Sequence, residues 1–154
     1  MNTIFTFVAI LLIDRLGRKK LLLYGVSGMI FCLLAIGSCF YFDATSGPWL
    51  LIFILGYVAS FSASLGPIPW VIISEIFPTK TRGIAMSFSV VVIWLGVVFI
   101  TQMTPVMLES LGGAFTFWAF MVNAIILVIF TWKVIPETKQ KTLEEIERHW
   151  KEIG

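Results

Sequence analysis

The sequence contains little charge, and this scarcity excludes a water-soluble globule. Only 13% of the 154 residues are charged and 58% are hydrophobic, and the mean hydropathy is +0.96. A soluble domain is about 25% charged, so this chain has too few charged side chains to cover a surface in water. Its apolar residues fall in blocks of about 20, the length that crosses a hydrocarbon core of about 30 Å. The composition therefore predicts an all-α membrane protein.

Residue types that carry most enzyme chemistry are also scarce. The one histidine, His149, lies in a polar C-terminal stretch, and Cys32 and Cys39 are seven residues apart in one apolar block. That spacing separates the two cysteines by about 10 Å along a helix, too far for a disulfide. The sequence has no Cys/His metal spacing, no glycine-rich phosphate loop and no paired carboxylates within a span. We therefore expect no catalytic residues, no metal, no cofactor and no nucleic-acid partner.

The apolar blocks predict four full membrane spans and one shorter segment. The expected full spans are residues 21–42, 48–74, 84–108 and 114–135, and the short segment is 1–13. A helix of 13 residues is about 20 Å long, so the short segment either re-enters the membrane or belongs to something longer. We expect a turn at 109–113 and an interruption by Pro105 shortly before it. Residues 136–154 form a polar tail, in which a Thr-x-x-Glu capping box at 142–145 predicts a short amphipathic helix.

The basic residues indicate the orientation of the chain in the lipid bilayer. All 11 lysine and arginine residues lie at 15–20, at 80–82 or from 133 onward. Four alternating spans place these three clusters on one face, whereas the opposite loops carry Asp43 and Glu109 and no basic residue. The positive-inside rule makes the basic face cytoplasmic. We therefore expect a multi-pass protein of the plasma membrane with its C-terminus in the cytoplasm.

A break lies inside the second full span, at Gly66-Pro67-Ile68-Pro69-Trp70. Proline removes a helix hydrogen bond and clashes with the preceding turn, and hydrocarbon tolerates freed backbone groups only where protein or a cavity satisfies them. A broken membrane helix therefore indicates a transport site, and the alternative is a simple structural kink. The Trp70 ring next to the break either stacks on a ligand or packs against protein.

Two charged motifs lie on the cytoplasmic face, DRLGRKK at 14–20 and SEIFPTKTRG at 74–83. A positive-inside stop signal explains the basic residues of the first motif, but it does not explain Asp14 and Gly17 among them. An acid such as Glu75 and a base such as Arg15, from separate loops, can form a charge cluster between helices that holds one conformation closed. Single surface pairs are weak, so this hypothesis requires a network.

Four motifs together resemble a known family. The patterns D-R-x-G-R-[RK], P-x-P-W, S-E-[IL]-F-P-x-x-x-R-G and P-E-T-K-x-x-T-L-E-E-I occur in this order from position 14 to 146. In order and spacing the chain, from Asn2 to about Trp150, is similar to the C-terminal half of the sugar porters of the major facilitator superfamily. The resemblance implies twelve helices in two six-helix halves that alternate access around a central sugar site. It also implies that this chain is a C-terminal fragment that begins within the eighth helix, with the N-terminal half as its missing partner.

The resemblance implies roles for individual residues. Asn2 matches an asparagine that hydrogen-bonds the sugar in some members, Trp70 a tryptophan that packs on the sugar, and Trp94 a tryptophan of the cavity wall. Ser62 stands where some members have glutamate, and Ile93 where some have an amide that contacts the sugar. These two departures suggest a sugar-binding set different from that of the animal glucose facilitators. The residues that match the cytoplasmic charge network are Asp14, Arg15, Arg18, Glu75 and Arg82.

The sequence as a whole predicts transport of a monosaccharide, a hexose or a pentose, by alternating access. Symport with protons stays open, because the coupling acid of the family lies in a first helix that this chain does not contain. The alternative is a truncated, non-transporting membrane protein or an interaction module.

Overall fold

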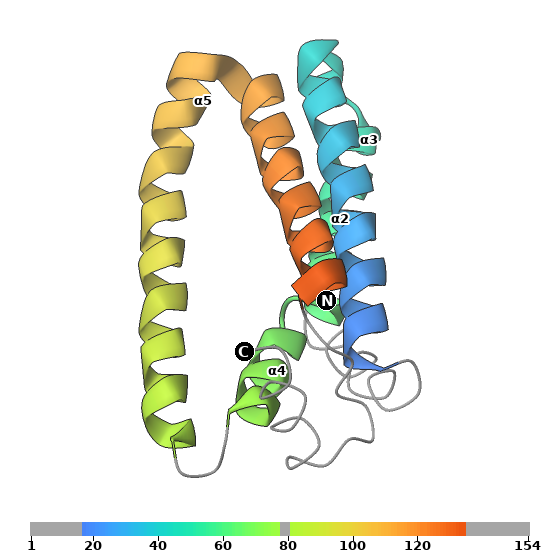
Figure 1. Cartoon of the computed structure of the whole chain (residues 1–154). Helices are drawn as coiled ribbons and strands as arrows, with labels where there is room; N and C mark the ends of the chain where they lie inside the picture. Colours follow the sequence, from blue (N-terminus) through green and yellow to red (C-terminus); the bar gives the residue numbers. More distant parts are fainter. Residues whose placement is uncertain (1–16, 78–80, 135–154) are drawn as a thin grey trace.

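The structure is a computed structural model that describes residues 17–77 and 81–134, and all the regular structure in these ranges is helical (Figure 1). The expectations for the segment 1–13 and the tail 136–154 lie outside the described residues. The elements are α2 (Arg18–Tyr41), the short 3-10 helix η1 (Ala44–Ser46), α3 (Pro48–Ala63), α4 (Ile68–Ile76) and α5 (Arg82–Val134).

The described residues contain three helical stretches long and apolar enough to cross a membrane, where the sequence predicts four. These stretches are Arg18–Tyr41, Pro48–Ser74 and Arg82–Val134. The last has 53 residues and, if straight, would be about 80 Å long, more than twice the thickness of the hydrocarbon core. It is not straight, because Gly112 has φ 78° and ψ 168°. The chain turns over there, and two arms, 82–111 and 113–134, run in opposite directions (Figure 1).

The turn between these arms is tighter than the sequence predicts. Helical geometry continues on both sides of Gly112, whereas the expected turn covers 109–113. Glycine adopts a positive φ without a steric penalty, so one residue reverses the chain. Pro105 lies inside the first arm and does not end it, since a membrane helix tolerates the loss of one backbone hydrogen bond.

The break in the second span separates α3 from α4. The N–H groups of Ser64 and Gly66 both donate to the Phe61 carbonyl, at 3.1 and 2.9 Å, and so close the end of α3. Pro67 and Pro69 stand at the start of α4, where a proline costs little because the first N–H groups of a helix have no partner within it. The chain therefore leaves one helix and starts another within a few residues.

Helix α2 packs between α3 and the second arm of α5. The α2 residues of its buried face recur every three to four positions, as one side of a helix does, and they are Leu22, Val26, Met29, Leu33 and Ile36. The lower part of this face joins Ile68 and Ile72 of α4 in one apolar cluster. By contrast, none of the residues of the first arm, 82–111, is buried in the described structure.

Small residues let α2 and α3 approach closely. A β-carbon at Gly25 would overlap the Ser64 side chain, and one at Gly28 would lie 2.8 Å from Ser60 Oγ. Helices in lipid associate through such close packing, because the hydrophobic effect does not drive apolar helices together there. The two glycines therefore fix the distance between α2 and the broken helix.

We expect Gly25→Ala to destabilise the 154-residue chain in detergent micelles by about 1–3 kcal/mol, because the added methyl group must push α2 away from Ser64. Thermal unfolding followed by circular dichroism measures this change. Gly96→Ala is the matched control, since nothing lies within 4 Å of a β-carbon at Gly96 and alanine is the better helix former by about 1 kcal/mol. Equal melting temperatures for the two variants would contradict the close approach.

Candidate functional site

The helix break holds Trp70 away from the apolar cluster. Ile68 and Ile72 of α4 are 0% and 5% exposed, and they share one face because they are four residues apart. Trp70 lies between them in the sequence and so faces the other side of the helix, where it is 43% exposed. The short helix α4 is therefore anchored by its isoleucines and presents the indole outward.

The other predicted sugar contacts differ from Trp70 in their location and in how exposed they are. Trp94 is in the first arm of α5 and 59% exposed. Ser62 is 1% exposed, and its hydroxyl donates to the Val58 carbonyl one turn back, at 2.7 Å. Burial next to the break thus directs Ser62 toward its own helix. Asn2 lies outside the described residues.

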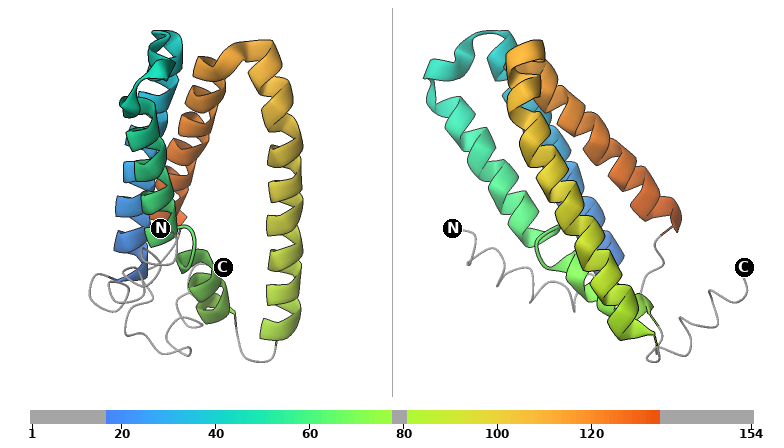
Figure 2. Two further views of the ribbon diagram at one scale, coloured as in Figure 1. Left: turned by 180° about the vertical axis from the view of Figure 1, so that it is seen from behind. Right: turned by 90° about the vertical axis from the view of Figure 1, so that its left-hand side faces the viewer.

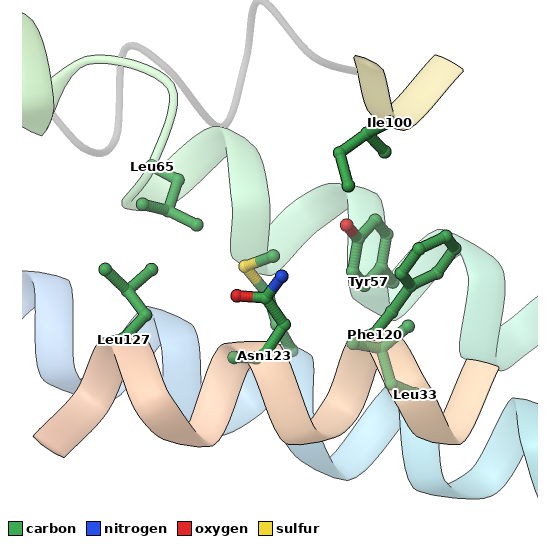
Figure 3. A pocket seen from close by; sticks show the side chains of 9 residues that line it. Leu33, Tyr57, Leu65, Ile100, Phe120, Asn123 and Leu127 are labelled. Carbon is green, nitrogen blue, oxygen red and sulfur yellow. The ribbon is translucent and has the colours of Figure 1, made fainter. Parts of the chain in front are cut away.

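A pocket of about 340 Å³ lies between α2, α3 and both arms of α5 (Figure 3). Its walls are largely apolar, and the polar side-chain groups among its described lining residues are the hydroxyl of Tyr57 and the amide of Asn123. Among the described residues, none of the sequence-predicted site residues lines it. The lining residues are Met29, Leu33, Tyr57, Leu65, Ile100, Phe120, Asn123, Ala124 and Leu127.

Sequence reasoning missed Asn123, although a signal was available. Asn123 is the one Asn or Gln side chain in the expected span 114–135. A strongly polar group inside a membrane helix is costly, so by itself it indicates a functional or interhelical contact. Tyr57 carried no comparable signal, because a tyrosine in an apolar helix is usually a packing residue.

The predicted charge network lies at one end of the bundle, as far as the structure describes it. Arg18 begins α2, Glu75 is in the last turn of α4 and Arg82 begins α5, and these helix ends lie together at the bottom of Figure 1. Phe77 is the C-cap residue of α4. The Nε of Arg82 donates to the Phe77 carbonyl at 3.4 Å. Asp14 and Arg15 lie outside the described residues, and the Glu75 side chain is not described.

Lys19 makes a long-range contact at the same end of the bundle. Its Nζ donates to the backbone carbonyl of Trp132, at 2.8 Å. The last carbonyls of a helix have no partner within the helix, and a cation near them is favourable because of the helix dipole. Lys19 therefore ties the start of α2 to the end of α5, whereas the neighbouring Lys20 is exposed.

An apolar bundle with an interrupted span and with basic residues gathered at one end is a multi-pass membrane protein of the transport class. The chain belongs to the family of sugar (and other) transporters of the major facilitator superfamily, whose family model matches residues 1–150. This is a family of carriers and not of enzymes.

Similar proteins include sugar carriers from distant organisms. The chain is 45% identical over 150 residues to the arabinose-proton symporter of Bacillus subtilis and covers 97% of itself and 32% of that protein. It is 38% identical to the D-xylose-proton symporter of Escherichia coli, with the same shares covered. It is 41% identical to the facilitated trehalose transporter of Bombyx mori, over 96% of itself and 30% of that protein.

Solved structures of a sugar carrier share the fold. The inward-open xylose transporter of E. coli matches with a TM-score of 0.89 at 40% identity, over 97% of this chain and 33% of that one. The proton:xylose symporter bound to 6-bromo-6-deoxy-D-glucose matches with a TM-score of 0.89 at 37% identity, over 97% and 32%. The chain thus spans about a third of the length of the relatives it matches.

We expect Lys19→Ala to loosen the last turn of α5, because the Trp132 carbonyl loses its charged donor. A hydrogen bond of this kind contributes about 1 kcal/mol, so protection of the backbone amides near Trp132 from hydrogen exchange should fall roughly fivefold. Lys20→Ala is the control, since it removes the same charge from the same motif without removing the contact. Similar exchange in both variants would show that charge alone matters.

Proposed function

We propose that the whole protein, of which this chain forms about a third, carries a monosaccharide across the membrane by alternating access. The observation that carries this proposal is the interruption of an apolar span between α3 and α4, with a half-exposed tryptophan directly after it. Broken helices recur at the substrate sites of secondary transporters. The similarity to arabinose, xylose and trehalose carriers supports a sugar as the substrate.

The proposed topology has four full crossings. Each arm of α5 is longer than the roughly 20 residues that a crossing requires, and the arms run in opposite directions (Figure 1). The basic ends of α2 and α5 then share the cytoplasmic side. This arrangement supports a multi-pass protein of the plasma membrane with a cytoplasmic C-terminus.

Proton-coupled symport is the proposed energy source, on the similarity to two sugar-proton symporters. Within the described helices the carboxylates are Glu75, in the last turn of α4, and Glu109, three residues before the kink. Neither position is central in a span, where a proton-coupling acid is usually found. The coupling acid of the whole protein therefore lies outside the described part of this chain.

The proposed roles follow from where the side chains lie. Trp70 covers an apolar face of the sugar ring, Trp94 contributes to the cavity wall and Asn2 hydrogen-bonds a sugar hydroxyl. Ser62 shapes the helix break, since its hydroxyl is engaged with Val58. The cytoplasmic latch that closes the carrier consists of Asp14, Arg15, Arg18, Glu75 and Arg82.

We expect Trp70→Ala to weaken sugar binding about tenfold, the equivalent of about 1.4 kcal/mol. The protein for this test is a chimera in which the present chain replaces the matching third of the B. subtilis arabinose-proton symporter. Equilibrium binding of arabinose to the purified chimera measures the effect. Trp49→Ala is the control, because Trp49 is an exposed tryptophan at the opposite end of α3. Unchanged affinity in Trp70→Ala would refute the proposed role.

The 154-residue chain by itself gives a second test, which addresses the alternative of a non-transporting membrane protein or interaction module. We expect no uptake of arabinose or xylose into liposomes that contain only this chain, because the described part of the chain buries no residue of the first arm of α5. Uptake of radiolabelled sugar measures this. Transport by the chain alone would contradict the proposal that about two thirds of the carrier lies elsewhere.

A further inference from the structure

The two polar groups of the pocket lie at the same depth in the membrane. Tyr57 is the tenth residue of α3, which starts at Pro48, and Asn123 is the eleventh residue of the second arm, which starts at 113. Both helices start at the same end of the bundle, so both groups lie about 15 Å from that end. This depth is half of a hydrocarbon core of about 30 Å.

The amide of Asn123 makes no hydrogen bond to any of the described residues. Figure 3 shows it directed into the pocket, toward the space that Tyr57, Leu65 and Ile100 border. An amide left without a partner in hydrocarbon costs several kcal/mol, roughly 2–7. An acyl chain of a lipid cannot satisfy it, so an occupant of the pocket that carries a polar group at this depth would remove the cost.

The shape of the surroundings fits a rod-like apolar occupant. The arms of α5 diverge from the kink at Gly112, as Figure 1 and the left view of Figure 2 show. The first arm is exposed along its length and mostly apolar, with large exposed side chains over several turns, among them Val91, Leu95, Val98 and Phe99. A monosaccharide has a hydroxyl group on nearly every carbon, and two polar groups in an apolar wall would leave most of those hydroxyls unsatisfied.

We propose that a membrane-spanning helix from the part of the carrier outside this chain lies between the arms of α5, and that a polar side chain at its midpoint hydrogen-bonds the Asn123 amide. This inference rests on the proposed function, because it requires the whole carrier. The relatives are about three times as long as this chain, so they supply further apolar helices. Asn123 is then an interhelical contact that fixes the register of that helix against α5.

The test compares Asn123→Leu in two backgrounds. In the arabinose-symporter chimera the substitution removes an interhelical hydrogen bond, and the melting temperature of the sugar-free protein should fall by about 1–3 °C. In the isolated 154-residue chain the same substitution removes an unsatisfied amide, and the melting temperature should stay the same or rise. Thr101→Val is the control, because the Thr101 hydroxyl bonds the Val97 carbonyl of its own helix and its loss should act alike in both backgrounds.

Three other outcomes overturn the proposal. An unchanged or higher melting temperature of the Asn123→Leu chimera would mean that no helix bonds the amide. Weaker arabinose binding at unchanged sugar-free stability would make the pocket a sugar site. A chimera that does not assemble would mean that the surface does not accept the helices of the relative. A fourth outcome separates the two proposals: a chimera that shows the expected melting-temperature changes in both backgrounds but does not transport arabinose would refute the proposed function and leave the helix contact in place.

Discussion

Hydrocarbon offers a peptide group no hydrogen-bond partner, so the backbone N–H and C=O groups of this protein have to bond with groups of the protein. The helices α2, α3 and α5 do this along most of their length, apart from Pro105 and the kink at Gly112 in α5. The link between α3 and α4 is also irregular, and two N–H groups share the Phe61 carbonyl there. This irregular backbone is tolerated because protein covers it, since Ser64 and Ile68 on either side are both 0% exposed.

Helix α2 covers the link between α3 and α4, and the positions of the other helices depend on its packing. Its glycines Gly25 and Gly28 bring it against the serines near the end of α3. On another side, Phe40 of α2 stacks on Phe117 of the second arm, with ring centroids 5.3 Å apart. Together these contacts hold the broken helix and the last arm in one unit. The exposure of Trp70 follows from this packing, because the same unit buries its neighbours Ile68 and Ile72.

The surface that the described chain leaves exposed is mostly apolar. The exposed face of the first arm of α5 is mostly apolar, and the polar groups among the described pocket residues are those of Tyr57 and Asn123. In the proposed carrier, the parts outside this chain cover this surface, because the chain spans about a third of its relatives. The charged helix ends lie away from it, at one end of the bundle, where Lys19 joins the first and last described helices.

The sequence by itself determined the membrane class, the family and the position of the helix break, and it predicted a cytoplasmic side for the basic residues. It could do so because hydropathy, charge clusters and proline act over a few neighbouring residues. It placed the reversal of α5 within 109–113, but only the structure assigned it to Gly112. The charge network remains a prediction, since Asp14 and Arg15 lie outside the described residues.

The tertiary structure alone decided which distant side chains meet. The sequence predicts Ser62 as a sugar contact, but in the structure its hydroxyl donates to the Val58 carbonyl of its own helix. Tyr57 and Asn123 border one pocket, and Lys19 reaches the carbonyl of Trp132, 113 residues away. No local pattern encodes such pairs, because they depend on how the helices rotate and approach one another, and small residues such as Gly25 set that geometry through contacts far apart in the chain.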